Sequence, residues 1–390
     1  MSAAAKRLVR WLYELGKISD DEGRLTRTFL SPAMRQANAR VAGWMREAGL
    51  AVREDTVGNL IGRLEGATPK AKTLLLGSHL DTVRDAGRFD GPLGVLLPIA
   101  ALMELRARGV TLPFAVEVLG FSEEEGVRFA SAYLGSKGFS GQLRAGDLTL
   151  RDSQGVSVRE ALDAHNGGNF SPPKAAHKKG ALLGYCEVHI EQGPVLEAGK
   201  LAVGVVAAIA GQTRGRLTFR GKAGHAGTTP MALRHDALAG AAEFIVAAEA
   251  LAKKTPSLVA TVGTLGVSPG APNVIPGEAT FSLDVRHPKD AARQAALKTL
   301  LKTADRIARR RGLKSSWQVT QDNPAVACDS ALTTALDASV RVEQGRSVAL
   351  VSGAGHDAVV MAAVAPVAML FVRCREGLSH HPDEYASPAD

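Results

Sequence analysis

Histidine and carboxylate side chains recur in short strings of this sequence, beginning with a His-x-Asp pair. His79 stands two residues before Asp81 and directly follows the apolar run 73–78, which favours a buried strand. In such a pair the histidine can bind a metal ion while the carboxylate orients its ring. Open α/β sheets bind ligands at the carboxyl ends of their strands. A single pair of this kind also occurs in purely structural roles, so both interpretations stay open.

Two acidic strings come next along the chain. Asp90 lies between glycines in the string 87–91, where it could bridge two cations or cap the following helix. Glu123, Glu124 and Glu125 follow the apolar run 114–121. Adjacent carboxylates repel one another unless cations neutralise them. One could bind a metal while its neighbour acts as a general base, or the run could be an acidic helix start.

Two further histidines, His189 and His380, also follow apolar stretches. Together with the first strings they give a candidate ligand set of three histidines and two carboxylates: His79, Asp90, Glu125, His189 and His380. Nitrogen and oxygen ligands of this kind suit Zn²⁺, Mn²⁺ or Co²⁺. Spacing along the chain does not show that the five side chains meet in space.

The segments around these strings predict an α/β domain. A strand at 73–78, a helix at 92–108 and a strand at 114–121 indicate a parallel βαβ unit. A similar pattern recurs near the C-terminus, with strands at 348–351 and 368–372 around a helix at 356–363.

The middle of the chain follows a different pattern. Its expected elements are strands at 217–220, 258–265, 279–286 and 315–319, with helices at 231–252 and 288–311. The order βαββαβ is typical of a ferredoxin-like unit. We therefore expect a catalytic domain formed by 1–211 and 324–390, with a second domain, 212–323, inserted into it.

Composition limits the classes of protein to consider. The chain has 390 residues, of which 45% are hydrophobic and 22% charged, with three cysteines and a net charge of +8. No apolar run approaches the roughly 20 residues of a transmembrane helix, and no signal peptide is recognisable, so we expect a cytoplasmic protein without a membrane partner. The basic run 309–311 suits a helix end, and no motif indicates nucleic-acid binding.

The ordered strings point to a known family. Seven of them, GSHLDTV, GRFDGPLGVL, FSEEEGVRF, HIEQGPVLE, GHAGTTPM, GAGHDA and GLSHHPDE, resemble the M20 metallopeptidase clan and its hydantoinase/carbamoylase branch. That branch holds allantoate amidohydrolases, N-carbamoyl-L-amino-acid hydrolases and β-ureidopropionases. The resemblance extends from about 12 to 384 and implies a di-metal α/β domain with an inserted ferredoxin-like lid that forms a homodimer.

The resemblance also implies roles for the metal-binding strings. His79 and His189 would bind different ions, Asp90 would bridge them, and Glu125 and His380 would complete the two coordination spheres. Two divalent ions per chain are implied, with Mn²⁺ favoured and Zn²⁺ or Co²⁺ possible. His380 is preferred to its neighbour because the family string is Gly-x-Ser-His, here 377–380. Of the remaining acidic residues, Glu124 would be the general base and Asp81 would orient the histidine before it.

Further residues match positions that contact substrate in the family. His225 would polarise the scissile carbonyl from across the dimer, or could simply pack at a helix entry. Asn273 and Arg286 match a carboxylate-binding pair, and the alternative for Arg286 is an exposed strand residue. Gln192 matches a substrate-contacting amide. His356 is left between two roles, supporting a ligand or forming a wall of the substrate site.

The segments 77–87, 210–214 and 369–380 look closer to allantoate amidohydrolases than to carbamoylases. The expected function is hydrolysis of a ureido C–N bond in a small carboxylate-bearing substrate, allantoate first, with release of ammonia and CO₂. The alternative is an N-carbamoyl-L-amino-acid hydrolase. A non-catalytic binding protein on this scaffold would have lost ligand residues, whereas every expected position is filled.

Overall fold

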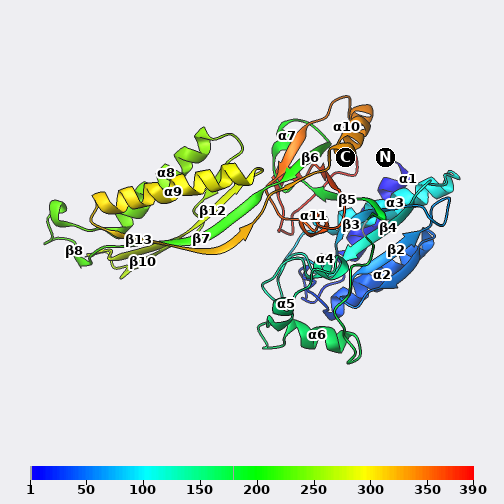
Figure 1. The fold of residues 1–390 in the computed structure, drawn as a ribbon, viewed down its shortest axis with the longest axis horizontal. Helices are drawn as coiled ribbons and strands as arrows, with labels where there is room; N and C mark the ends of the chain where they lie inside the picture. Colours follow the sequence, from blue (N-terminus) through cyan, green and yellow to red (C-terminus); the bar gives the residue numbers. More distant parts are fainter. Residues whose placement is uncertain (1, 179) are drawn as a thin grey trace. The chain divides into compact units, whose positions relative to one another are not determined.

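The computed structural model describes residues 2–178 and 180–390. The chain forms two compact units, one made of the residues up to Ala207 and from Cys328 onwards, the other of Ala208–Ala327. The boundaries predicted for the inserted segment were 212 and 323. Each unit has its own hydrophobic core (Figure 1).

The first unit is built on a mixed sheet. Its strands follow the order β1-β2-β4-β3-β5-β16-β6, and β15 also pairs with β6; β14 pairs with Ala208 and Ile209 at the end of β6, and these residues all belong to the second unit. The bounds are β1 Ala51–Glu54, β2 Leu60–Leu64, β3 Thr73–His79, β4 Ala115–Phe121, β5 Leu182–Ile190, β6 Val203–Ile209, β14 Val326–Ala327, β15 Ala349–Ser352 and β16 Val367–Val372.

Four neighbouring strands of this sheet, β4, β3, β5 and β16, are parallel. The pairing of His79 with Phe121 and of His189 with Phe371 puts their carboxyl ends at one edge. The expected parallel βαβ unit is therefore confirmed, with α3 as its helix. The strings with the five candidate ligands follow one of these strands or lie at its end, whereas GAGHDA follows β15.

Helices surround the sheet of the first unit. α3 starts directly after Asp90 and Gly91, contacts β3, β4 and β5, and is buried along its first two turns. The stacked rings of Trp11 and Trp44, with centroids 4.9 Å apart, join α1 to α2. The bounds are α1 Ala3–Leu15, α2 Pro32–Glu47, α3 Pro92–Ala107, α4 Leu134–Phe139, α5 Ala145–Thr149, α6 Val158–His165, α7 Val195–Ala198, α10 Ser330–Gln344, α11 Ala358–Met361 and the 3-10 turn η2 Arg375–Gly377.

The second unit has the expected ferredoxin-like arrangement. β13, β7 and β12 are neighbours, and β9 and β10 both pair with the outer side of β12, so the order is that of a βαββαβ unit. Burial alternates along β12 because one face packs on α8 and α9 and the other faces away. The bounds are β7 Gly211–Arg220, β8 Gly224–His225, η1 Met231–Leu233, α8 Ala237–Lys254, β9 Val259–Thr261, β10 Leu265–Ser268, β11 Val274–Ile275, β12 Glu278–His287, α9 Asp290–Arg310 and β13 Lys314–Asn323.

Two expected elements of the second unit are corrected. The helix predicted from residue 231 starts at Ala237, because the Asp236 side chain caps it by accepting a hydrogen bond from the Ala239 N–H. The strand predicted at 258–265 is divided into β9 and β10. Between them the N–H groups of Gly263 and Thr264 bond to the Ser282 hydroxyl instead of a strand partner.

In the first unit, the helix predicted at 356–363 is shorter and covers only Ala358–Met361.

None of the helices in the described part of the chain is long and apolar enough to cross a bilayer.

The close packing of α3 on the sheet gives a test of the fold. A Cβ at Gly94 would lie 2.1 Å from the Val188 carbonyl oxygen, whereas a Cβ at Gly43 in α2 would meet nothing within 4 Å. We expect Gly94→Ala to lower stability by about 1–3 kcal/mol through overpacking. Gly43→Ala should raise it by up to about 1 kcal/mol through helix propensity. Urea unfolding of both variants measures this, and an unchanged midpoint for Gly94→Ala would contradict the packing.

Candidate metal centre

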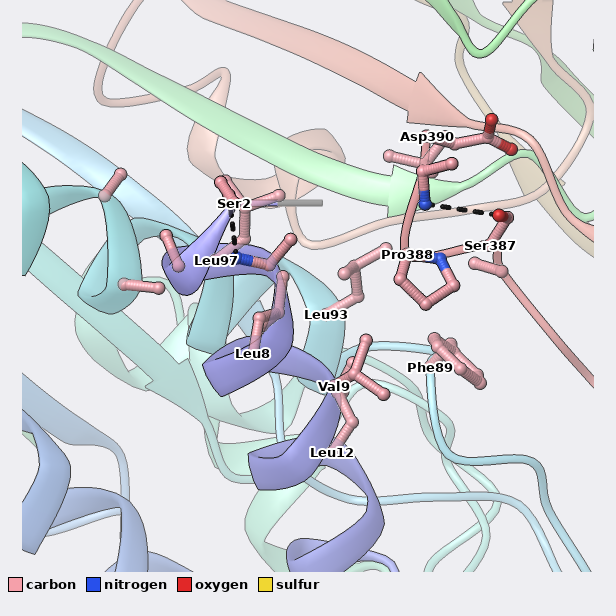
Figure 2. A pocket seen from close by; sticks show the side chains of 17 residues that line it. Ser2, Leu8, Val9, Leu12, Phe89, Leu93, Leu97, Ser387, Pro388 and Asp390 are labelled. Atoms are coloured by element: carbon pink, nitrogen blue, oxygen red, sulfur yellow. Dashed lines mark hydrogen bonds between the residues drawn. The ribbon is translucent and has the colours of Figure 1, made fainter.

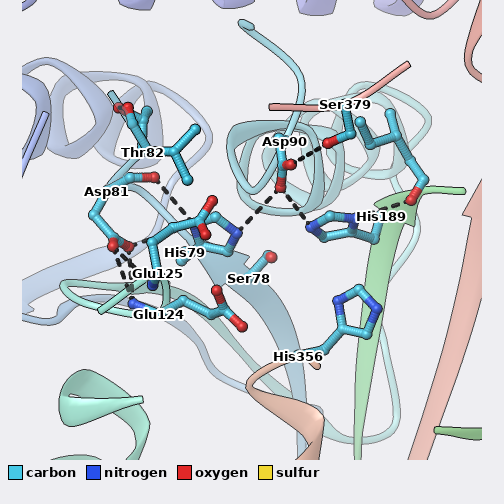
Figure 3. Close-up of polar contacts among 12 residues, drawn as sticks. Ser78, His79, Asp81, Thr82, Asp90, Glu124, Glu125, His189, His356 and Ser379 are labelled. Atoms are coloured by element: carbon cyan, nitrogen blue, oxygen red, sulfur yellow. Dashed lines mark hydrogen bonds and ion pairs between the residues drawn. The ribbon is translucent and has the colours of Figure 1, made fainter. Parts of the chain in front are cut away.

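Three buried side chains from different segments meet at the carboxyl edge of the first sheet. His79 is the last residue of β3, His189 is the second-last residue of β5, and Asp90 lies in the loop before α3. The Nε2 atoms of His79 and His189 lie 3.5 and 3.0 Å from Asp90 Oδ1. Figure 3 shows both imidazole rings directed towards the Asp90 carboxylate. The sequence proposed these three residues as ligands, and the fold brings them together.

Hydrogen bonds orient both rings. His79 Nδ1 lies 3.0 Å from the Asp81 carbonyl oxygen, and His189 Nδ1 lies 2.9 Å from that of Ile190. A carbonyl oxygen only accepts, so each Nδ1 carries a proton. In a neutral ring Nε2 then keeps a lone pair, as a metal-binding histidine requires. Asp81 therefore orients His79 mainly through its backbone oxygen, with its carboxylate Oδ1 3.4 Å from the same ring nitrogen.

The Asp81 carboxylate also holds the loop that follows β4. It accepts hydrogen bonds from the N–H groups of Glu124, at 3.0 and 3.1 Å, and of Glu125, at 3.1 Å. These contacts turn both glutamate side chains towards His79, as Figure 3 shows. A loop tied in this way keeps two carboxylates close together despite their mutual repulsion.

The electrostatics of this loop favour a bound cation. Burial, followed by the charge of Glu125, raises the pKa of Glu124 well above its usual range. Burial and the charge of Asp90 raise the pKa of Glu125 to about 7. Carboxyl groups that resist ionisation because they are buried beside other carboxylates become favourable anions once cations lie between them.

His380 approaches from the segment after β16. Its Nε2 lies 3.3 Å from Asp90 Oδ2 and 3.5 Å from Glu125 Oε1, and its side chain is half exposed. His381 instead points elsewhere: its Nδ1 accepts a hydrogen bond from the Asp383 N–H. The preference for His380 over its neighbour therefore agrees with the geometry.

The residues present fit a pair of divalent cations. Three groups have ligand atoms within 4.8 Å of one another: His79–Asp90–His189, His79–Glu124–Glu125 and Asp90–Glu125–His380. Asp90 is shared between the two groups that contain His189 and His380, which is where a bridging carboxylate would lie. Imidazole nitrogens with carboxylate oxygens suit Zn²⁺, Mn²⁺ or Co²⁺. Glu124 and Glu125 both reach the cluster, so the choice of Glu124 as base stays a prediction.

Two residues that contact Asp90 were not predicted from the sequence to have a role in the site. Ser379 Oγ donates to Asp90 Oδ2 at 2.5 Å, and Glu384 accepts the Asp90 N–H at 2.9 Å. Both lie in the string GLSHHPDE. The string therefore contained these two residues, but only its histidines were considered as functional candidates. Gln192, expected to contact substrate, donates to Asp90 Oδ2 at 2.9 Å, and its role towards substrate stays a prediction.

His356 lies beside the cluster. Its ring packs edge-on against His189, with centroids 4.6 Å apart, and its Nε2 lies 2.8 Å from the Ser352 hydroxyl. Burial lowers its pKa well below the usual value, which favours the neutral ring. It belongs to none of the ligand groups found among the described residues, and its contacts support the ring of His189.

The remaining expected substrate contacts lie in the second unit. His225 in β8 pairs with Val274 in β11, and the Asn273 carbonyl accepts the Ala226 N–H, so His225 and Asn273 are brought together. Nδ1 of His225 accepts the N–H groups of Gly227 and Thr228, at 3.1 and 3.2 Å. Its proton is therefore on Nε2, and the side chain is exposed.

Arg286 lies on β12, where its Nε and Nη2 atoms donate to the Asp284 carboxylate at 2.9 and 3.0 Å. Gln212 and Arg214 of β7 donate to the same carboxylate. Arg286 is therefore an ion-paired, half-buried guanidinium, not an exposed strand residue.

A separate cavity of about 680 Å³ lies between α1, α3 and the C-terminal segment (Figure 2). Its lining is largely apolar and contains no histidine; Asp390 is its one acidic residue. Such a lining lacks the groups for acid, base or metal chemistry, so we place the candidate active site at the histidine–carboxylate cluster instead.

Fold and cluster together define an α/β protein with an inserted ferredoxin-like unit and a buried site able to hold divalent cations. The family model of Peptidase family M20/M25/M40 matches residues 75–390, and the chain belongs to this family. The resemblance drawn from the sequence strings is thereby confirmed.

Two enzymes and one solved structure illustrate what the chain is similar to. The chain is 42% identical to allantoate deiminase 2 of Glycine max, over 97% of this chain and 85% of that protein. It is 40% identical to the N-carbamoyl-L-amino acid amidohydrolase of Geobacillus stearothermophilus, over 99% of this chain and 94% of that protein. Among solved structures, an amidase of the hydantoinase/carbamoylase family from Burkholderia multivorans matches with a TM-score of 0.93 at 35% identity, over 99% of this chain and 93% of that one.

The adjacent histidines of the C-terminal segment offer a direct test of the centre. His380→Asn should lower the divalent metal retained per chain after dialysis, because it removes a nitrogen that faces Asp90 and Glu125. His381→Asn is the matched control and should retain as much metal as the unchanged protein. Elemental analysis of both variants measures this. Equal metal content in the two variants would contradict the place given to His380.

Proposed function

We propose that this protein is a metal-dependent amidohydrolase that cleaves a ureido C–N bond in a small substrate bearing a carboxylate. The convergence of His79, Asp90 and His189 in one buried cluster carries the proposal. The similarity to an allantoate deiminase and to an N-carbamoyl-L-amino acid amidohydrolase supports the bond type, since both relatives are named for action on such compounds.

In this proposal His79, Asp90, Glu125, His189 and His380 hold two divalent cations, Mn²⁺ by preference. Bound there, cations of this kind acidify water and polarise a carbonyl group. Glu124 takes a proton from the attacking water and returns it to the departing nitrogen, which leaves as ammonia. The carbamate that remains loses CO₂. Glu124 is placed for this role because its carboxylate lies in the same group of ligand atoms as His79 and Glu125.

The second unit supplies the contacts to substrate in this proposal. The Nε2–H group of His225 is a donor suited to the oxyanion that develops on the ureido carbonyl. Arg286 and Asn273 are proposed to bind the substrate carboxylate, with Asp284 holding the guanidinium in place on β12. Binding the carboxylate away from the reacting carbon would align the ureido group, because remote contacts orient the scissile bond. We further propose a cytoplasmic homodimer in which His225 acts on the partner's substrate.

The general base can be tested with a pair of neighbouring glutamates. Glu124→Gln should retain its metal and lose roughly 10²–10⁴-fold in kcat, the range for a lost acid–base group. Glu123→Gln is the control: Glu123 belongs to none of the ligand groups found among the described residues, and an amide oxygen can still accept the Gly126 N–H that its carboxylate accepts at 2.6 Å. Glu123→Gln should stay within a few fold of the unchanged enzyme. Normal turnover by Glu124→Gln would refute the assignment.

Substrate choice can be settled by comparing two ureido compounds. Allantoate is proposed first because the segments 77–87, 210–214 and 369–380 resemble allantoate amidohydrolases. N-carbamoyl-L-amino acids are the second candidate, since the relative from Geobacillus stearothermophilus has a similar identity. We expect kcat/KM for ammonia release from allantoate to exceed that from N-carbamoyl-L-methionine by at least tenfold. The reverse order would assign the protein to the carbamoylases.

A further inference from the structure

A buried carboxylate that belongs to none of the candidate ligand groups lies directly behind Asp90. Glu384 is 2% exposed and follows the His380 segment. Its Oε1 accepts hydrogen bonds from the N–H groups of Phe89 and Asp90, at 2.8 and 2.9 Å. A Cβ at Gly87 would lie 2.5 Å from this oxygen, so the turn before Asp90 has room for the carboxylate only because residue 87 is glycine.

The second oxygen of Glu384 faces the segment that carries His380. Ser379 Oγ lies 3.4 Å from Glu384 Oε2 and donates to Asp90 Oδ2 at 2.5 Å. Gln192 Nε2 donates to the same Asp90 oxygen at 2.9 Å and to Ser379 Oγ at 3.1 Å. Glu384 thus bonds to the backbone that presents Asp90 and touches the hydroxyl beside His380.

These contacts separate Glu384 from the ligands. Its Oε1 is engaged by two backbone donors, and none of the groups of ligand atoms within 4.8 Å includes it. Asp90 and His380 are far apart in sequence, and each comes from a loop outside the strands. Two such loops keep a constant separation only if something joins them. The Ser379 hydroxyl bonds directly to Asp90, and Glu384 adds a second connection through the backbone N–H groups of Phe89 and Asp90.

We propose that Glu384 is a positioning residue for the cation pair: it fixes the backbone of Asp90 relative to His380 and so sets the affinity of the site for divalent metal. The inference rests on the proposed function, because it assumes that the cluster binds cations. Partners that orient metal ligands typically contribute about 10–100-fold to metal affinity. Losing the acceptor would leave two buried N–H groups without a partner and free the Asp90 turn.

The test measures Zn²⁺ affinity of the full-length protein by competition with a chromogenic chelator. Glu384→Ala should bind Zn²⁺ at least tenfold more weakly than the unchanged protein. Glu384→Gln should stay within about threefold, because its amide oxygen can still accept both N–H groups. Asp383→Asn is the matched control, since the Asp383 side chain is 77% exposed on the same segment and should not change the affinity.

Thermal unfolding of the metal-free proteins distinguishes a role of Glu384 in metal affinity from a role in stability alone. If Glu384→Ala lowers the melting temperature but leaves Zn²⁺ affinity within threefold, the proposal is overturned. If that variant does not fold, Glu384→Asp replaces it, because the shorter side chain cannot reach both donors and should also weaken binding at least tenfold.

The outcome is also distinct from that of the proposed function. Unchanged protein that binds Zn²⁺ tightly but releases no ammonia from ureido compounds would contradict the activity and leave the role of Glu384 standing. Unchanged protein that binds no divalent metal would overturn both.

Discussion

Buried carboxylates repel one another, and the first unit is arranged around that constraint. Asp81, Asp90, Glu124 and Glu125 all lie at one edge of the sheet, where water is largely excluded. Backbone N–H groups satisfy Asp81, and side-chain donors reach one oxygen of Asp90. The glutamates after β4 lack comparable compensation, which is why their pKa values rise. A site with uncompensated negative charge and three nearby imidazoles is suited to cations.

Parallel strands make such a concentration possible. Each strand of β4, β3, β5 and β16 ends at the same edge, so segments far apart in sequence deliver their polar residues to one place. Close packing holds them there: Gly94 lets α3 lie against the carbonyl of Val188, and Gly87 leaves space for Glu384. The precision of the cluster therefore depends on backbone contacts as well as on the ligands.

The strands of the first unit could be predicted because apolar runs such as 73–78 and 114–121 are bounded by polar strings. The start of α8 could not, because Met231 and Leu233 continue the helical periodicity yet are 77% and 68% exposed. Their spacing resembles a buried face, whereas the capping side chain of Asp236 decides where the helix begins. The five ligand candidates could be named from strings and resemblance. The role of Glu384 could not, since its bond to Asp90 joins residues 294 positions apart.

The order of the segments has a consequence for the protein's tolerance of cleavage. His79, Asp90, Glu125 and His189 precede the second unit along the chain, whereas His380 and Glu384 follow it. A polypeptide cut within the second unit would therefore carry the imidazole of His380 on a different fragment from the other four ligand candidates. Neither fragment alone would hold the whole set.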